Sequence, residues 1–214
     1  TRFNISYVCE FYGSTEGNVS FLGFDGKVGA VGRIPSYLEK GVFGHVAFVK
    51  FDVVEEKPIR GNDGFCIKTL PSEPGEAIGK LGDDARTRFE GYNDEAATQK
   101  KILHDVFETG DMWFRTGDLF KENGDGSFTI VGRVNDVYKS GGYDVHPAEV
   151  EAVLMAHPRV KIACVIGVPD STFITVGRAF VVFQSAVDTE QLREFLRERL
   201  AGYKVPKEIV VLEQ

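Results

Sequence analysis

The chain has 214 residues, of which 43% are hydrophobic and 12% aromatic, so it can bury one large core or two smaller ones. Its formal net charge of -7 argues against nucleic acid or an anionic lipid surface as the main partner, because binding either one requires a basic face. Three cysteines without CxxC spacing indicate neither a disulfide framework nor a zinc site, and we expect buried free thiols in a reducing compartment.

No apolar run approaches the roughly 18 residues that a membrane-spanning helix needs. The longest run, at 162–168, is expected to be a buried strand, and the N-terminus has no signal-peptide pattern. Because the chain starts at Thr1 and enters a strand-like stretch almost at once, we expect a fragment whose missing part lies upstream. The expected location is the cytoplasm or the cytosolic face of a membrane.

The first two-thirds of the chain is predicted to be rich in β-strands joined by glycine-containing turns. A short strand at 6–10 leads into a polar loop at 12–17 that is bracketed by glycines. Asp94 is expected to cap a helix running to about Phe107, because apolar residues recur there at helical spacing. Further strands are predicted at 45–54, 65–70, 76–81, 113–121 and 127–133, with a turn cluster at 57–64. The last two strands flank Asn-Gly and Asp-Gly pairs, which predict a hairpin because these residues accept positive φ.

Beyond Arg133, helices and strands alternate, which indicates a separate small α/β domain. One helix is predicted to open at Pro147, and a second at Asp188, with Gln191 as its capping partner. Strands are predicted at 161–168, 178–184 and 208–212. The predicted fold class is therefore α/β (α+β), with a β-rich part over 1–134 and a small α/β part over 135–214.

Residues 11–16, Phe-Tyr-Gly-Ser-Thr-Glu, have the components of a nucleotide site at a strand end. The ring of Tyr12 could stack on a base, and Gly13 lets the backbone approach a ligand. A hydroxyl could bond a phosphate oxygen, and the carboxylate of Glu16 could hold Mg²⁺, which prefers oxygen ligands. The alternative interpretation is a turn with a capping threonine, since short polar glycine loops are common.

Two further segments combine acidic or polar residues with glycine. Asp118 lies in an otherwise apolar strand region, where aspartate is disfavoured, so it indicates a ligand, a bulge or a tight turn. Residues 132–143 join the two architectures with charges and a double glycine. This segment is typical of an interdomain linker, and active sites favour such junctions.

In order and approximate spacing, the three segments resemble motifs of the adenylate-forming superfamily of acyl-CoA synthetases, luciferases and peptide-synthetase adenylation domains. Residues 10–17, 24–33 and 89–98 look closest to the very-long-chain acyl-CoA synthetase and fatty acid transport protein branch. The resemblance covers nearly all of the chain. It implies that residues 1–134 are the C-terminal portion of a large AMP-binding domain. Residues 135–214 would be a small mobile C-terminal domain that is truncated at its end.

The resemblance also implies roles for single residues of the first segment. Tyr12 would pack on adenine with Gly13 beside the nucleotide, Thr15 would contact a phosphate, and Glu16 would help to bind Mg²⁺. Thr15 and Glu16 are therefore the candidate catalytic residues, and Glu16 is the candidate metal ligand.

The other two segments would complete the cofactor site. Asp118 and Arg133 would hold the ribose of ATP, and Lys139 would face either phosphate or solvent. Asn135 occupies the hinge position of the family, where many relatives have Asp or Lys. Gly141 and Gly142 match the loop that lines the pantetheine tunnel for CoA.

Several features depart from the family pattern. Residues 132–136 look closer to medium-chain and aryl-acid synthetases than to the transport-protein branch, so the chain length of the acid stays open. The triphosphate loop and the adenylation lysine of the family do not occur in the chain, and Lys204 and Lys207 are expected on a surface turn. We therefore expect the chain alone to be inactive.

The predicted function is that of a fragment of an ATP-dependent acyl-CoA synthetase, an acid-thiol ligase that activates a fatty-type carboxylic acid through an acyl adenylate. ATP, Mg²⁺ and CoA are the implied cofactors and co-substrates. Peripheral membrane association through an upstream part and the oligomeric state stay open. The alternatives are an adenylating enzyme for an aryl acid or a carrier protein, and a catalytically incomplete nucleotide-binding or interaction module.

Overall fold

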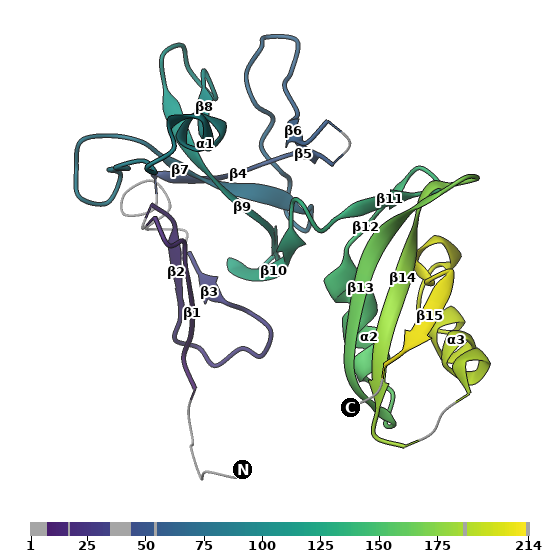
Figure 1. Ribbon diagram of the computed structural model, residues 1–214. Helices are drawn as coiled ribbons and strands as arrows, with labels where there is room; N and C mark the ends of the chain where they lie inside the picture. Colours follow the sequence, from purple (N-terminus) through teal and green to yellow (C-terminus); the bar gives the residue numbers. More distant parts are fainter. Residues whose placement is uncertain (1–7, 17, 35–43, 54, 186–187, 213–214) are drawn as a thin grey trace. The chain divides into compact units, whose positions relative to one another are not determined.

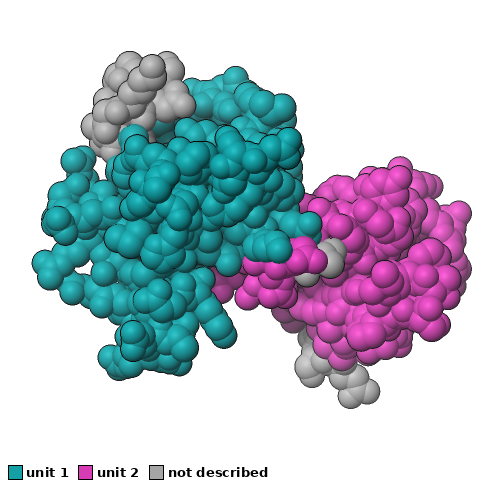
Figure 2. Space-filling view, turned by 90° about the horizontal axis from the view of Figure 1, so that it is seen from above, with its two compact units in different colours: residues 1–52, 57–130 teal, residues 53–56, 131–214 magenta. Residues whose placement is uncertain are grey.

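The computed structural model describes residues 8–16, 18–34, 44–53, 55–185 and 188–212 (Figure 1). The chain forms two compact units, which Figure 2 distinguishes by colour. The first unit comprises residues 1–52 and 57–130, and the second comprises 53–56 and 131–214. The structural division falls at 130/131, a little before the boundary predicted at 134/135. The assignment of these parts to a large and a mobile domain stays a prediction.

The first unit is built around a six-stranded sheet with the order β3-β10-β9-β7-β4, in which β8 also pairs with β9. Two small antiparallel pairs, β1-β2 and β5-β6, complete its strands. Its elements are β1 (Glu10–Gly13), β2 (Ser20–Gly23), β3 (Gly32–Arg33), β4 (Val46–Val49), β5 (Phe51–Asp52), β6 (Lys57–Pro58), β7 (Gly75–Lys80), α1 (Glu95–Lys100), β8 (Ile102–His104), β9 (Met112–Glu122) and β10 (Ser127–Arg133).

Strand β7 is buried on both faces, and this gives the sheet a core on each side. Successive side chains of a strand point to opposite faces. Accordingly, Ala77 packs with the cluster that contains Phe21 and Phe120, while Ile78 packs with the cluster that contains Trp113. The first unit therefore depends on the register of β7 more than on that of an edge strand.

The second unit is a two-layer α/β arrangement. Its sheet has the order β12-β11-β14-β13, and β15 joins β14 in parallel. Buried residues of α2 and α3 belong to one cluster with alternate residues of β13 and β14, so both helices cover the same face of this sheet. Its elements are β11 (Tyr138–Ser140), β12 (Tyr143–Val145), α2 (Pro147–Met155), β13 (Val160–Asp170), β14 (Ile174–Phe183), α3 (Thr189–Arg197), the 3-10 helix η1 (Gly202–Lys204) and β15 (Glu208–Val211).

The predicted fold class is confirmed, and so are the hairpin of β9 with β10 and the helices that begin near Pro147 and Asp188. The helix predicted from Asp94 to Phe107 is wrong beyond its first turns. Asp94 caps α1 by accepting hydrogen bonds from two backbone amides, but α1 ends at Lys100. Residues 102–104 instead form β8, because pairing with β9 satisfies their backbone while the side chain of Leu103 still packs against the core.

Other predictions need smaller corrections. The strand predicted at 6–10 begins outside the described residues, and the described strand is β1 at Glu10–Gly13. Residues 65–70 form isolated bridges and no strand. The run at 162–168 lies in β13 with one face exposed, and of the three cysteines only Cys66 is buried, while Cys9 and Cys164 are exposed. In the part of the chain that the structure describes, no helix is long and apolar enough to cross a membrane.

Asp111 supports the turn between β8 and β9. Its buried carboxylate accepts hydrogen bonds from the backbone amides of Val106 and Phe107 and from Nε1 of Trp113. Burial alone would raise the pKa of Asp111, but the bonds from Trp113 and the backbone amides outweigh it and hold this pKa below its usual value.

We predict that Asp111→Ala lowers the free energy of unfolding by roughly 3 kcal/mol, because three donors lose a charged acceptor. The measurement is urea unfolding of the protein at pH 7. Since the native pKa is depressed, the stabilisation is present above about pH 4 and is lost as the pH falls below it, so the difference from wild type should shrink in acid.

Asp63→Ala is the matched control, because Asp63 is exposed and bonds a single backbone amide, that of Phe65. We expect it to stay within about 0.5 kcal/mol of wild type. Equal costs for the two variants would contradict the proposed importance of the buried carboxylate.

Candidate functional site

Tyr12 is held at the end of β1 by an aromatic cluster. Its ring stacks on Phe21, with centroids 5.7 Å apart, and meets the edge of Phe120 at 4.8 Å. Its hydroxyl donates a hydrogen bond of 2.7 Å to Oδ2 of Asp118. Burial, together with this neighbouring carboxylate, raises the pKa of Tyr12 well above its usual value, so the hydroxyl stays protonated.

Asp118 lies in an irregular part of β9. Leu119 pairs with Glu76 and Arg115 pairs with Ile78, so Ala77 of β7 faces three residues, 116–118, instead of one. Gly117 within this bulge has φ of +80°, a conformation that favours glycine. Of the interpretations that the sequence offered for an acidic residue here, the bulge is confirmed.

Glu16 lies in the turn after β1 and is half-buried. The hydroxyl of Tyr92 donates a hydrogen bond to its Oε1. Burial first, and the Glu16 carboxylate second, raise the pKa of Tyr92 to about 12. Tyr92 is itself positioned by α1, since its amide donates to Oγ1 of Thr98 over 2.8 Å.

The sequence analysis gave Tyr92 no role of its own. The only signal was its place in the segment 89–98 that resembled a family motif. Its contact with Glu16 joins residues 76 positions apart, which no local pattern reveals.

The remaining residues of this loop differ in exposure. Thr15 is exposed in the turn, whereas Ser14 is half-buried. Oγ of Ser14 accepts a hydrogen bond of 3.3 Å from the amide of Val19, which stabilises the loop. A Cβ at Gly13 would meet no atom of the described residues within 4 Å. The backbone at Gly13 therefore faces open space, which leaves room for a ligand.

Arg133 is the last residue of β10, whose end belongs to the second unit, and Asn135 lies in the turn that follows. Both are exposed, and the amide of Asp136 donates to the carbonyl of Arg133 over 3.1 Å to close the turn. The double glycine forms the two-residue turn between β11 and β12, with φ of +58° at Gly141 and +88° at Gly142. A hairpin of this type favours glycine for conformational reasons alone.

Three lysines of the second unit, Lys139, Lys204 and Lys207, each have an acidic neighbour. Nζ of Lys139 lies 3.8 Å from Oδ1 of Asp144, its cross-strand partner. Nζ of Lys204 lies 2.6 Å from Glu149, and Lys207 pairs with Asp170. Both Lys204 and Lys207 were expected on a surface turn; Lys207 is exposed after η1, whereas Lys204 lies in η1 and is half-buried.

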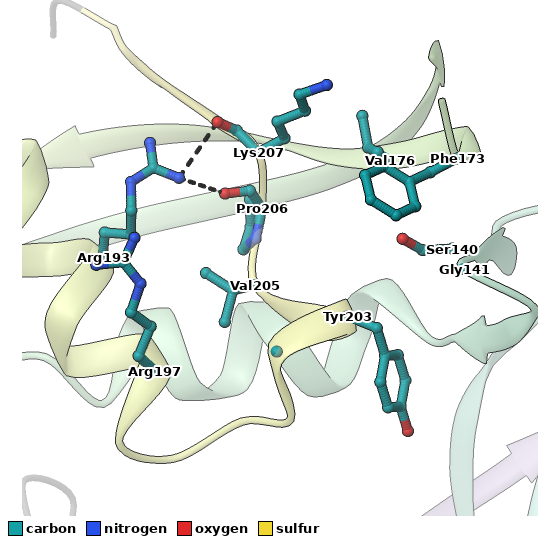
Figure 3. Close-up of a pocket in the computed structure, with 11 residues that line it drawn as sticks. Ser140, Gly141, Phe173, Val176, Arg193, Arg197, Tyr203, Val205, Pro206 and Lys207 are labelled. Atoms are coloured by element: carbon teal, nitrogen blue, oxygen red, sulfur yellow. Dashed lines mark hydrogen bonds between the residues drawn. The ribbon is translucent and has the colours of Figure 1, made fainter. Parts of the chain in front are cut away.

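A pocket of about 340 Å³ lies in the second unit beside Gly141 (Figure 3). Nη1 of Arg193 lies on one side of it and donates to the carbonyls of Pro206 and Lys207 at 2.7 and 3.2 Å. The pocket is lined by Ser140, Gly141, Phe173, Val176, Arg193, Arg197, Gly202, Tyr203, Val205, Pro206 and Lys207. Its wall thus combines aromatic and cationic side chains with the double-glycine turn.

Of the predicted site residues, the first unit brings Tyr12 and Asp118 into direct contact, although they are 106 positions apart. Glu16 lies four residues after Tyr12 and contacts Tyr92. No group of three or more His, Cys, Asp or Glu side chains among the described residues could hold a metal ion without other ligands. A single carboxylate still suits Mg²⁺, which keeps several waters and takes further oxygens from substrate phosphates.

Comparisons with known proteins give consistent relatives. Residues 149–214 match the family model of the AMP-binding enzyme C-terminal domain. The chain is 38% identical over 169 residues to long-chain fatty acid transport protein 2 of Rattus norvegicus, which covers 78% of this chain and 27% of that protein. It is 44% identical over 135 residues to 2-succinylbenzoate–CoA ligase of Bacillus licheniformis, with 63% and 27% covered.

Solved structures agree with the fold. An ATP-bound RpMatB-BxBclM chimera superposes with a TM-score of 0.72 at 30% identity, covering 97% of this chain and 37% of the other. The o-succinylbenzoate CoA synthetase (MenE) of Bacillus subtilis, in complex with its acyl-adenylate intermediate, gives 0.71 at 27% identity, covering 98% and 38%. The chain spans about a third of the length of the relatives that it matches.

We predict that Tyr12 and Asp118 are energetically coupled by roughly 1.5 kcal/mol, as expected for a hydrogen bond to a charged acceptor. The measurement is a double-mutant cycle of Tyr12→Phe and Asp118→Asn by urea unfolding. As the control, the cycle is repeated with Tyr143→Phe in place of Tyr12→Phe, because Tyr143 is exposed. A coupling indistinguishable from zero would mean that the contact does not fix Asp118.

Proposed function

Because the chain belongs to the adenylate-forming (AMP-binding) superfamily, we propose that it is part of an ATP-dependent acyl-CoA synthetase that activates a fatty-type carboxylic acid. The observation that carries this proposal is the pairing of Tyr12 with Asp118 at 2.7 Å. In this pair an aromatic ring lies beside a carboxylate, an arrangement that suits recognition of a base and its adjoining ribose.

In this proposal each residue of the first unit has a chemical task. The ring of Tyr12 packs on adenine, and Asp118 accepts hydrogen bonds from the ribose hydroxyls. Thr15, exposed in its turn, donates to a phosphate oxygen, and the open backbone at Gly13 lets the nucleotide approach. By the resemblance to the family, Arg133 would add a cationic contact to the ribose.

Glu16 would hold Mg²⁺, which supplies positive charge beside the phosphates when it is bound. The hydroxyl of Tyr92 orients the Glu16 carboxylate through its hydrogen bond. Thr15 and Glu16 thus bind and orient the triphosphate for the first half-reaction.

Two half-reactions follow. A carboxylate oxygen of the acid attacks the α-phosphorus of ATP, and the bond to the β-phosphate breaks so that pyrophosphate leaves. The CoA thiolate then attacks the acyl carbonyl, and AMP leaves as acyl-CoA forms. Preorganised hydrogen-bond donors stabilise the charge that develops in both transition states.

The second unit would serve the thioester step. Gly141 and Gly142 would line the path of pantetheine, and the pocket beside Gly141 would receive part of CoA, with Lys139 facing phosphate or solvent. Asn135 is the proposed hinge, since it is exposed in a turn. We place the enzyme in the cytoplasm or at the cytosolic face of a membrane, where ATP and CoA are available.

A second candidate is an aryl-acid CoA ligase. It is favoured by the 44% identity over 135 residues to 2-succinylbenzoate–CoA ligase, beside 38% over 169 residues to long-chain fatty acid transport protein 2. Acid-dependent exchange of labelled pyrophosphate into ATP, measured on the complete protein with acids of graded chain length and with aryl acids, would separate the two. Replacing free CoA by a holo carrier protein tests which of the two accepts the acyl group. If no acid supports exchange, the result favours a nucleotide-binding module without catalysis.

In the complete protein, we predict that Asp118→Ala reduces adenylate formation at least tenfold, since each lost hydrogen bond from ribose to a charged acceptor is worth roughly 1.5–3 kcal/mol. Pyrophosphate exchange at varied ATP concentration measures the effect. The exposed carboxylate variant Asp63→Ala is the control. If Asp118→Ala leaves the dependence of the exchange rate on ATP concentration unchanged, Asp118 has only a structural role in β9.

We predict that Asn135→Pro impairs thioester formation more than adenylate formation, because proline fixes φ near -65° and resists the backbone change that a pivot requires. Pyrophosphate exchange and CoA-dependent AMP release, measured on the same preparation, report the two half-reactions. Equal losses in a folded variant would show that Asn135 is no selective pivot.

A further inference from the structure

The bulge in β9 removes regular ladder hydrogen bonds from the interior of the first unit. Three residues, 116–118, face the single residue Ala77, and the backbone groups within the bulge need other partners there. Side chains supply them. Oγ1 of Thr116 donates to the carbonyl of Ala77 at 2.7 Å and accepts from the amide of Asp118 at 3.1 Å.

Glu76 supplies the other partner and is completely buried. Its Oε1 accepts from the amide of Gly117 at 3.2 Å. The same carboxylate accepts hydrogen bonds from Nε of Arg115 at 3.1 Å and from its Nη2 at 2.9 Å. The guanidinium lies 5.4 Å from the centre of the Phe51 ring. A buried carboxylate in a strand is costly unless it is paired and bonded in this way.

The carboxylate of Glu76 bonds residues that lead up to Asp118. It bonds the backbone of Gly117, the immediate neighbour of Asp118, and it anchors Arg115 at the start of the bulge. Thr116 bonds the amide of Asp118 itself. The backbone path that leads to the Asp118 carboxylate is therefore set by the side chains of Glu76 and Thr116, and Thr116 also interacts with the hydroxyl of Tyr12.

We propose that Glu76 is a positioning residue for ribose recognition: together with Thr116 it shapes the β9 bulge so that Asp118 presents its carboxylate to the ribose hydroxyls. This inference rests on the proposed role of Asp118 and names the residues through which that role is achieved. A purely structural ion pair would stabilise the fold without affecting the choice between nucleotides.

The test compares two ligands that differ only in the groups that Asp118 would contact. Binding of ATP and of 2′,3′-dideoxy-ATP, each with Mg²⁺, is measured by calorimetry on the complete protein. Glu76→Gln keeps the shape and an acceptor for Gly117 but loses the charge that holds Arg115. We expect its affinity for ATP to fall about tenfold while its affinity for the dideoxy nucleotide stays within twofold of wild type.

Glu73→Gln is the matched control. Glu73 lies three positions before Glu76 and pairs with Lys50 at 2.8 Å, in a half-exposed setting outside the bulge. Both affinities should be unchanged in this variant. Thr116→Val, which removes the hydroxyl that bonds Ala77 and Asp118, should reproduce the selective loss for ATP and serves as the deciding variant if Glu76→Gln does not fold.

The outcomes separate this inference from the proposed function. If wild type prefers ATP over the dideoxy nucleotide and the variants keep that preference, or lose both affinities equally, the positioning role is rejected while the ribose site stands. If wild type shows no preference, the ribose role of Asp118 fails and the inference fails with it. If neither variant folds, the network is structural alone and the inference is likewise rejected.

Discussion

The buried contact of Glu76 with Arg115 and the Gly117 amide is the interaction on which the first unit depends. Strand β7 has a core on both faces, so a slip of its pairing by one residue would exchange Ala77 and Ile78 between two different clusters. The register of β7 is thus fixed, and the extra residues of β9 have to bulge. A bulge in the interior is tolerated only if its backbone groups are bonded, and here a carboxylate and a hydroxyl meet that need.

Local signals in the sequence predicted the elements whose geometry is decided locally. Asn-Gly and Asp-Gly predicted the turn after β9, where Gly124 and Gly126 both have φ of +79°. An acidic residue in an apolar strand predicted the irregularity at Asp118. The end of α1 could not be predicted in this way, because apolar residues at 102–107 suit helix and strand alike and the pairing with β9 decides between them. The exposed face of β13 was missed for a similar reason, since a continuous apolar run does not reveal that only one face of the strand is covered.

In the candidate site too, local motifs identified some residues but not the partners that come from distant parts of the chain. Its members Tyr12, Glu16 and Asp118 could be named from motifs, but their partners could not, because Tyr92 and Phe120 approach them from distant parts of the chain. Glu76 carried a usable signal, since it is an acidic residue inside the strand Gly75–Lys80, and the same reasoning that drew attention to Asp118 applies to it. What no sequence pattern could supply is that the two carboxylates serve one bulge.

The two units hold their candidate residues by different means, and the difference suits the proposed chemistry. Tyr12 and Asp118 are fixed by contacts that span much of the first unit, so their geometry changes only if its sheet changes. Asn135, Gly141 and Gly142 lie in exposed turns whose conformation is set by neighbouring residues. Exposed turns can change backbone conformation at low cost, whereas a packed sheet cannot. A ribose site therefore belongs on the rigid sheet, and a pivot belongs in a turn such as that of Asn135.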